Sequence, residues 1–190
     1  MKFKNKYYIL RHGQTIYQTK KRKTVYPKND NPKVHLTEKG RRQVRASANK
    51  LKSVGIELIY SSDFYRARQT AKIVAKELGF KKINFDQRLR DVNLGIYHGG
   101  KKEVFYRDFP SGISRFSKRP KNGENWSDVQ KRVIAFMREL EKKYKGKVIL
   151  IVSHGDPLWL LERKVKKLPS FDFIRATKLN YIQPGELRRL

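Results

Sequence analysis

The chain has no cysteine among its 190 residues, which excludes disulfides, thiolate chemistry and cysteine-based zinc sites. It also has little negative charge, because 46 lysines and arginines stand against 17 aspartates and glutamates and leave a formal net charge of +29. Long hydrophobic runs are missing too. The apolar run near the N-terminus stops at Arg11, too early for a signal-peptide core or a membrane span. We therefore expect a cytoplasmic protein without a membrane-spanning segment.

The residues that are present suffice for a folded core. Hydrophobic residues make up 38% of the sequence and aromatic residues 12%. The length fits one domain at the usual size of about 100 to 200 residues, and no Pro/Gly/Ser-rich linker divides it. A single domain over residues 1–190 is expected.

The excess of positive charge indicates anionic partners. A field of this sign attracts phosphorylated small molecules, nucleic acid or anionic membranes, without choosing among them. The lysines and arginines occur in short groups scattered along the chain, so any binding of nucleic acid would be non-specific. The sequence leaves the oligomeric state open.

Apolar runs alternate with helical patterns along the chain. Continuous apolar runs, typical of buried parallel strands, lie at residues 7–10, 56–60 and 148–152, with weaker candidates at 83–85 and 179–182. Apolar residues recur at helical spacing at 37–51, 64–78, 126–145 and 157–162, with Thr37 as an N-cap and Gly79 as a stop. This alternation predicts an α/β fold with a mostly parallel central sheet flanked by helices on both faces.

One short pattern occurs twice. Residues 8–13 and 150–155 each combine an apolar strand, one polar residue, a histidine and a glycine. Ligands of open α/β sheets bind beyond the carboxyl ends of the strands, so His12 and His154 stand where chemistry is expected. The glycines are expected to let the backbone come close to a bound group.

Arginines accompany these histidines. Arg11 precedes His12, and Arg66 and Arg68 open the helix that follows the run at 56–60. Planar guanidinium groups match the spacing of phosphate oxygens. Two imidazoles with guanidinium groups at strand ends therefore suggest a phosphoryl group held against a histidine, although Arg68 fits a solvated helix arginine equally well.

Five blocks of the sequence, in order, resemble the histidine phosphatase superfamily, also called the phosphoglycerate-mutase-like family. They are the RHG of 11–13, the SSDFYRARQTA of 61–71, the LRD of 89–91 with Gly95, the GE of 123–124 and the SHG of 153–155. The resemblance runs over nearly the whole chain. It implies a phosphoglycerate-mutase-like fold and a phosphorylated small-molecule substrate.

The resemblance also implies roles for individual residues. By this resemblance, His12 stands at the position of the nucleophile that becomes phosphohistidine. The positions of Arg11, Arg66 and His154 resemble those that form the rest of the family's phosphate pocket. Asp91 stands where the family places a proton donor, although more familiar members have Glu there. An alternative for Asp91 is a plain ion pair with a neighbouring arginine, Arg88 or Arg90.

Other positions match the family less closely. Thr15 matches and is expected to help bind phosphate. Gln18 replaces an asparagine that touches phosphate in many members, so we include it among the phosphate-binding residues as a weaker candidate. His35 and His98 also depart from the pattern, and we expect both to be solvated or packing histidines.

The segment 101–122 is expected to be a short, substrate-facing insertion. Phosphoglycerate mutases of the family carry a much longer insertion at this place, so the resemblance implies that a short one favours water as the phosphoryl acceptor. We expect a basic, aromatic entrance formed by Tyr97, Phe105, Tyr106, Phe109, Phe116, Lys101, Lys102, Arg107 and Arg115.

Three functions remain open at this point. The first is a metal-independent phosphatase that hydrolyses a small phosphomonoester through phosphohistidine on His12. The second is a cofactor-dependent phosphoglycerate-type mutase, and the third is a non-catalytic, basic, polyanion-binding protein on the same fold. We expect no cofactor and no metal site, because the four histidines lack metal-ligand spacing and guanidinium groups already supply positive charge.

Overall fold

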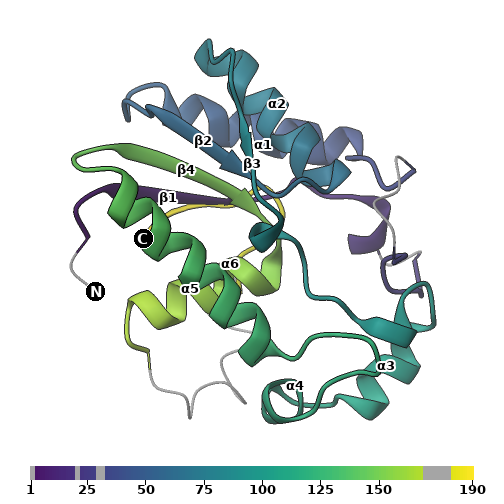
Figure 1. Cartoon of the computed structure of the whole chain (residues 1–190). Coiled ribbons are helices and arrows are strands. Elements are labelled where there is room, and N and C mark those ends of the chain that lie inside the picture. Colours follow the sequence, from purple (N-terminus) through teal and green to yellow (C-terminus); the bar gives the residue numbers. More distant parts are fainter. Residues whose placement is uncertain (1–2, 20–21, 29–32, 169–180) are drawn as a thin grey trace.

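A five-stranded sheet forms the centre of the computed structural model, which describes residues 3–19, 22–28, 33–168 and 181–190 (Figure 1). The strands are β1 (Lys6–Arg11), β2 (Leu58–Ser61), β3 (Asn84–Phe85), β4 (Val148–Ser153) and β5 (Leu187–Arg189). Their order in the sheet is β3-β2-β4-β1-β5. All pairs are parallel except β1 with β5, so the predicted fold class is confirmed.

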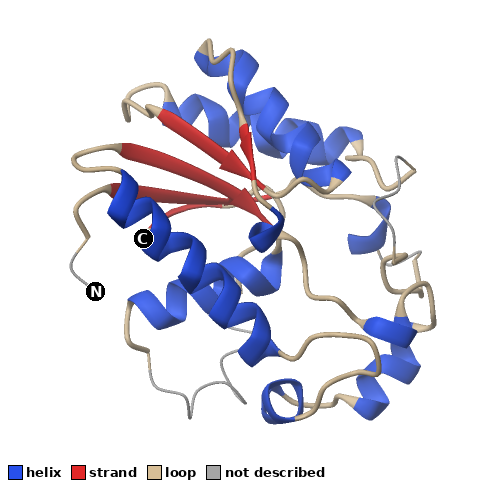
Figure 2. Ribbon diagram, in the orientation of Figure 1, coloured by secondary structure: helices blue, strands red, loops and turns tan. Residues whose placement is uncertain are grey.

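Helices cover both faces of this sheet (Figure 2). The helices are α1 (Glu38–Leu51), α2 (Tyr65–Leu78), α3 (Lys102–Asp108), α4 (Gly112–Ser117), α5 (Trp126–Lys143) and α6 (Gly155–Val165). Short 3₁₀ turns lie at η1 (Ile16–Gln18), η2 (Gln87–Leu89) and η3 (Gly95–Tyr97). Helices α1 and α2 pack together on one face, and α5 and α6 lie on the other.

The alternation of side chains along the central strands explains the two layers. On β4, Ile149 and Ile151 join the core beneath α5 and α6, whereas Leu150 and Val152 join the core beneath α1 and α2. Successive strand residues point to opposite faces, so a strand covered on both sides must be apolar throughout. The continuous apolar run of β4 has this origin.

The helix ends follow from local capping. The Thr37 hydroxyl accepts a hydrogen bond of 3.0 Å from the Gly40 N–H at the start of α1, as predicted. Gly79 ends α2 with a φ of 74°, a left-handed conformation that favours glycine.

The C-terminal strand differs from the prediction. A strand was expected at 179–182; residues 179 and 180 lie outside the described residues, and Tyr181 and Ile182 are not in a strand. The last strand is β5, which the charged sequence Leu187–Arg189 does not suggest. Its Arg188 side chain donates to the buried Glu162 of α6 at 2.6 Å, which ties this antiparallel edge to the helix layer.

Residues 101–122 contain α3 and α4, which the sequence analysis did not predict. The C-terminal end of this segment meets the turn η3 that precedes it, because the Ile96 N–H donates to the Lys121 carbonyl at 3.1 Å. Gly95 makes this approach feasible: its φ is 57°, and a Cβ built there would lie 2.0 Å from the Lys121 oxygen. In Figure 1 these helices lie on the side toward which the strand arrows point.

No helix in the described part of the chain combines the length and the apolar character that a bilayer crossing requires.

Candidate active site

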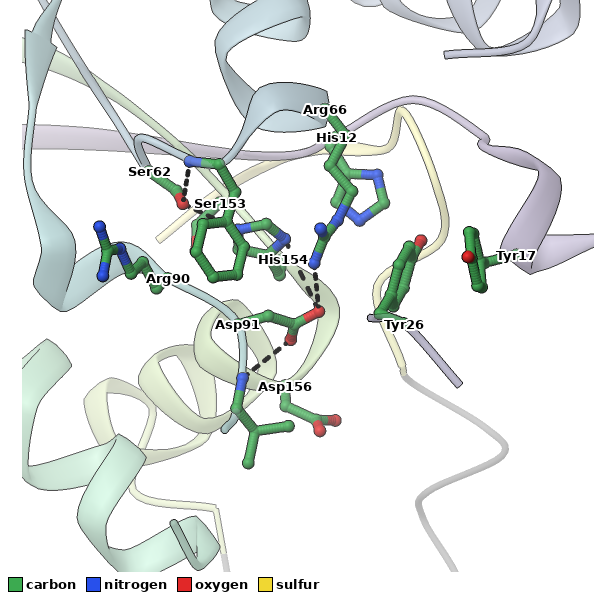
Figure 3. A network of polar contacts seen from close by, with 12 residues as sticks. His12, Tyr17, Tyr26, Ser62, Arg66, Arg90, Asp91, Ser153, His154 and Asp156 are labelled. Carbon is green, nitrogen blue, oxygen red and sulfur yellow. Dashed lines mark hydrogen bonds and ion pairs between the residues drawn. The ribbon is translucent and has the colours of Figure 1, made fainter. Parts of the chain in front are cut away.

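Strand register brings the two repeated histidines together. Arg11 of β1 pairs with Ser153 of β4, so the next residue of each strand, His12 and His154, leaves the sheet at the same level. The His12 N–H donates to the Ser153 carbonyl at 3.0 Å, and the two imidazole centroids lie 5.2 Å apart (Figure 3). Both histidines are buried.

The surroundings of His12 favour a neutral ring with one defined tautomer. Its Nδ1 lies 2.8 Å from the Gly13 carbonyl oxygen, which can only accept, so Nδ1 carries the proton and Nε2 keeps its lone pair. Burial lowers the pKa of His12 well below the usual range, and the charges of Arg66 and Arg11 lower it further. The His12 Nε2 atom is therefore a neutral nitrogen that can act as a nucleophile.

His154 is also held neutral. Its Nε2 lies 2.8 Å from the Ser62 hydroxyl, at the end of β2. Its Nδ1 has no hydrogen-bond partner among the described residues and lies 3.7 Å from a carboxylate oxygen of Asp91. Burial is the main cause of the lowered pKa of His154, and Arg66 and His12 add to it.

Arg66 and Asp91 form an ion pair beside the histidines. The Arg66 Nη2 donates to the Asp91 Oδ2 at 2.8 Å. The alternative partners of Asp91 are engaged elsewhere, because Arg90 pairs with Asp63 and Arg88 with Asp86. The Arg66 guanidinium also lies 4.0 Å from the ring centroid of Tyr26. Its Nε is buried without a hydrogen-bond partner in the described part of the chain.

The pKa of Asp91 is raised, which favours a protonated carboxyl. Burial is the largest cause, and the charge of Asp156 adds to it, whereas Arg66 and Arg11 act in the opposite direction. A carboxyl of this kind is suited to donate a proton and to take one back.

The loop that carries Asp91 is fixed from α5. Arg132 donates to three backbone carbonyls of this loop, those of Arg88, Arg90 and Asp91. The same guanidinium binds both carboxylate oxygens of Glu124 at 2.8 and 3.0 Å. Arg132 was not predicted, because in the sequence it is an ordinary polar residue on an amphipathic helix.

Arg11 lies on another wall of the site. Its Nη1 donates to the Ile182 carbonyl at 2.8 Å, and its guanidinium lies 5.3 Å from the Tyr181 ring centroid. The Tyr181 hydroxyl in turn donates to Asp156 at 2.6 Å. Asp156 and Tyr181 were not predicted, although Asp156 follows the Ser153–Gly155 pattern directly.

Thr15 and Gln18 are engaged with each other. The Gln18 side-chain oxygen accepts from the Thr15 N–H and hydroxyl, both at 2.8 Å, and the Gln18 amide binds the Tyr26 hydroxyl. These contacts close a capping box around η1. Gln18 lines the cavity described below, and a phosphate-binding role for either residue stays a prediction.

A cavity of about 560 Å³ extends from this site. Its lining includes Arg11 at the end of β1, Asp91 in the loop after η2, Asp156 in α6, and residues of α3 and α4. Of the expected entrance residues, the cavity is lined by Lys102, Phe105, Tyr106, Phe109 and Arg115. The others do not line it: Tyr97 bonds Asp108, Phe116 packs against Trp126, Arg107 pairs with Asp108, and Lys101 is exposed.

The remaining candidates are Arg68, His35 and His98. Arg68 is exposed, with its guanidinium 5.7 Å from the Phe85 ring centroid, and His35 is exposed as well. His98 is half-buried, binds the Tyr26 carbonyl through Nδ1 and accepts from the Leu94 N–H, which is a packing role.

The two glycines after the histidines lie against other parts of the protein, and their expected approach to a bound group stays a prediction. A Cβ on Gly13 would lie 2.5 Å from the Gly40 carbonyl of α1, and a Cβ on Gly155 would lie 2.2 Å from the Tyr181 hydroxyl. Each glycine allows a close approach within the protein itself.

The described residues contain no group of three or more histidine, cysteine, aspartate or glutamate side chains placed to hold a metal ion.

Comparison with known proteins agrees with this arrangement. The sequence profile of the histidine phosphatase superfamily (branch 1) matches residues 7–183. A protein of Escherichia coli described as a probable phosphoglycerate mutase, GpmB, is 32% identical over 171 residues, covering 86% of this chain and 76% of the relative. The chain belongs to the histidine phosphatase superfamily.

Solved structures give the same picture. A mycobacterial glucosyl-3-phosphoglycerate phosphatase superimposes with a TM-score of 0.78 at 27% identity, covering 98% of this chain and 89% of that one. YhfR of Bacillus stearothermophilus gives a TM-score of 0.79 at 27% identity, over 97% and 90% of the two chains.

Proposed function

We propose that the protein is a metal-independent phosphatase that hydrolyses a small phosphomonoester through a phosphohistidine on His12. The Nε2 of His12 attacks phosphorus, and the bond to the ester oxygen breaks as Asp91 gives that oxygen its proton. Water then attacks the phosphohistidine and loses a proton to the Asp91 carboxylate. Inorganic phosphate leaves, and both residues return to their starting states.

The observation that carries this proposal is the state of His12. Its Nδ1 is bound to a backbone carbonyl, and burial with two nearby guanidinium groups lowers its pKa, so Nε2 is free and unprotonated. A histidine with a proton on Nε2 would have to lose that proton before Nε2 could attack phosphorus.

The surrounding charges fit a developing phosphoryl transition state. Arg66 and Arg11 supply fixed positive charge around the histidines, and His154 Nδ1 lacks a partner among the described residues. Donors that are already oriented toward the reacting group stabilise the transition state without reorganisation. We infer that these three side chains hold the equatorial phosphoryl oxygens.

The test is hydrolysis of p-nitrophenyl phosphate in the presence of EDTA. The wild-type protein should release phosphate and form an acid-labile phosphoenzyme, and His12→Ala should lose both. The exposed His35 supplies a matched control, since His35→Ala should leave both signals intact. Turnover that survives in His12→Ala, or that EDTA abolishes in the wild-type protein, would contradict the proposal.

Phosphoglycerate mutase activity is a second candidate. It is favoured by the curated relatives described as probable phosphoglycerate mutases at 32% identity. A mutase would interconvert 2- and 3-phosphoglycerate in a reaction that needs a bisphosphate primer. Release of inorganic phosphate as the only product would exclude this candidate.

A further inference from the structure

Tyr26 lies against the Arg66 guanidinium on the wall of the cavity (Figure 3). The guanidinium carbon is 4.0 Å from the centroid of the Tyr26 ring and 5.2 Å from that of the Phe64 ring. The negative face of an aromatic ring attracts a guanidinium without using its hydrogen-bond donors. The Tyr26 ring can therefore hold Arg66 in place while the N–H groups that do not bind Asp91 face a phosphoryl group.

Tyr17 supports the Tyr26 ring. In Figure 3 the ring of Tyr26 lies between Arg66 and the ring of Tyr17. The two tyrosine rings are stacked, with centroids 4.5 Å apart and an interplanar angle of 27°. The Arg22 guanidinium carbon in turn lies 4.9 Å from the Tyr17 centroid. Tyr26 cannot move away from Arg66 in this direction without displacing Tyr17.

A closed ring of hydrogen bonds fixes the Tyr26 hydroxyl. The Thr15 hydroxyl donates its one proton to the Gln18 side-chain oxygen, and the Gln18 amide donates to the Tyr26 oxygen. The Tyr26 and Thr15 hydroxyl oxygens lie 2.9 Å apart, and because the Thr15 proton is already used, Tyr26 is the donor to Thr15. The three side chains satisfy one another, which keeps the Tyr26 ring in one orientation.

Arg66 needs an anchor whose charge does not change during the proposed reaction. Its other anchor is Asp91, which accepts from the Arg66 Nη2 at 2.8 Å. Asp91 gives a proton to the leaving oxygen and takes one back from water, so its attraction for the guanidinium differs between the two half-reactions. The Tyr26 ring is neutral throughout, so its attraction for the guanidinium stays constant.

We propose that Tyr26 is a positioning residue that keeps the Arg66 guanidinium directed at the phosphoryl group while Asp91 changes its protonation state. This inference rests on the proposed phosphatase function and adds a residue that lies outside the five sequence blocks described above. Tyr26 takes no part in bond formation or proton transfer. It acts through the negative charge on its ring face, so the electrons of the ring, and not only its size, determine the effect.

Graded withdrawal of electrons from the ring tests this. Tyr26 is replaced by phenylalanine and by the mono-, di- and trifluorinated analogues of phenylalanine, which keep nearly the same shape but weaken the attraction for a cation step by step. Tyr26→Phe should keep kcat/KM for p-nitrophenyl phosphate within about 3-fold of the wild-type value, since one hydroxyl group is lost and the ring remains. Fluorination should then lower kcat/KM stepwise, by about 10-fold in total. A residue that only fills space would give a flat series.

A double-mutant cycle assigns the effect to Arg66. Tyr26→Leu, which removes the ring, should lower kcat/KM by at least about 10-fold in the wild-type protein. When Arg66→Gln is already present, the same change should cost less than about 2-fold, because the cation that the ring holds is gone. Calorimetric binding of inorganic phosphate completes the cycle for any variant whose turnover is too slow to measure.

Tyr8→Leu is the matched control. Tyr8 lies on β1, is half-buried like Tyr26 and does not line the cavity. This variant should leave kcat/KM unchanged with and without Arg66→Gln. If Tyr26→Leu does not fold, the fluorinated series measured in the same two backgrounds still decides.

Two results would overturn the inference. One is a kcat/KM that stays constant along the fluorinated series, and the other is an equal loss from Tyr26→Leu with and without Arg66→Gln. Either result would leave the phosphatase function standing, provided that His12→Ala still abolishes turnover. Loss of the function itself would instead appear as wild-type protein that does not hydrolyse p-nitrophenyl phosphate.

Discussion

Replacing Asp91 with asparagine separates its proposed role as an acid from its role as a partner of Arg66. Asparagine has the same shape, and its side-chain oxygen can still accept from the Arg66 Nη2 that now lies 2.8 Å from the carboxylate. The variant cannot carry or release a proton. The structure therefore predicts a chemical defect in a largely unchanged site.

The size of the defect depends on the leaving group. An alkoxide needs a proton as it departs, so kcat/KM for alkyl phosphates should fall by about 10²- to 10⁴-fold, the usual contribution of general acid catalysis. Nitrophenolate is stable without a proton, so kcat/KM for p-nitrophenyl phosphate should fall far less. Its kcat should still drop, because hydrolysis of the phosphohistidine loses its base and the phosphoenzyme accumulates.

Steady-state kinetics on both substrate types, combined with quenching to trap the phosphoenzyme, check this prediction. An equal loss of kcat/KM on the two types would refute the reasoning. It would mean that Asp91 acts only by positioning Arg66.

Three further predictions follow from single contacts. Asp156→Asn keeps an acceptor for the Tyr181 hydroxyl but removes the negative charge that raises the pKa of Asp91. The alkaline limb of the kcat/KM profile for alkyl phosphates should therefore move to lower pH. A limb that does not move would contradict the electrostatic argument. Arg132→Gln should destabilise the fold by roughly 1.5–3 kcal/mol in chemical denaturation, the usual contribution of hydrogen bonds to a charged group. Because the variant releases the loop that carries Asp91, it should also lower kcat/KM for alkyl phosphates more than for p-nitrophenyl phosphate. Thr37→Ala should cost about 1 kcal/mol of unfolding free energy, because alanine lacks the hydroxyl that accepts from the Gly40 N–H. Thr37→Ser keeps this hydroxyl and should be nearly unchanged, and equal stability of the two variants would refute this.

Much of the layered fold was predictable, because burial on both faces leaves a direct pattern in the sequence. The runs at 7–10 and 148–152 are β1 and β4, and the helical spacing at 64–78 is α2. Strand β5 escaped prediction because two of its three residues are arginines. Its place in the sheet is set by pairing with β1 and by the ion pair of Arg188 with Glu162, which are contacts between distant segments.

The candidate site divides in the same way. His12 and His154 could be placed together in advance, since both follow parallel strands and such strands end at one edge of the sheet. The partners of Asp91 could not, because Arg88 and Arg90 are nearer in sequence than Arg66. The contacts of the Arg115 guanidinium with the rings of Phe105, Tyr106 and Trp126 could not be predicted either, since α3 and α4 are short helices without a clear apolar period.

A site rich in arginine presents a conflict that the arrangement of charges resolves. Burial lowers the pKa of His12 and raises that of Asp91, so it favours the neutral nucleophile and the protonated acid together. The guanidinium groups of Arg66 and Arg11 help the first and oppose the second, because positive charge lowers both pKa values. The negative charge of Asp156 opposes this lowering at Asp91, and it is not among the causes of the lowered pKa of His12. The proposed reaction needs a pH above the pKa of His12 and below that of Asp91, so the negative charge of Asp156 widens the working range at its alkaline side.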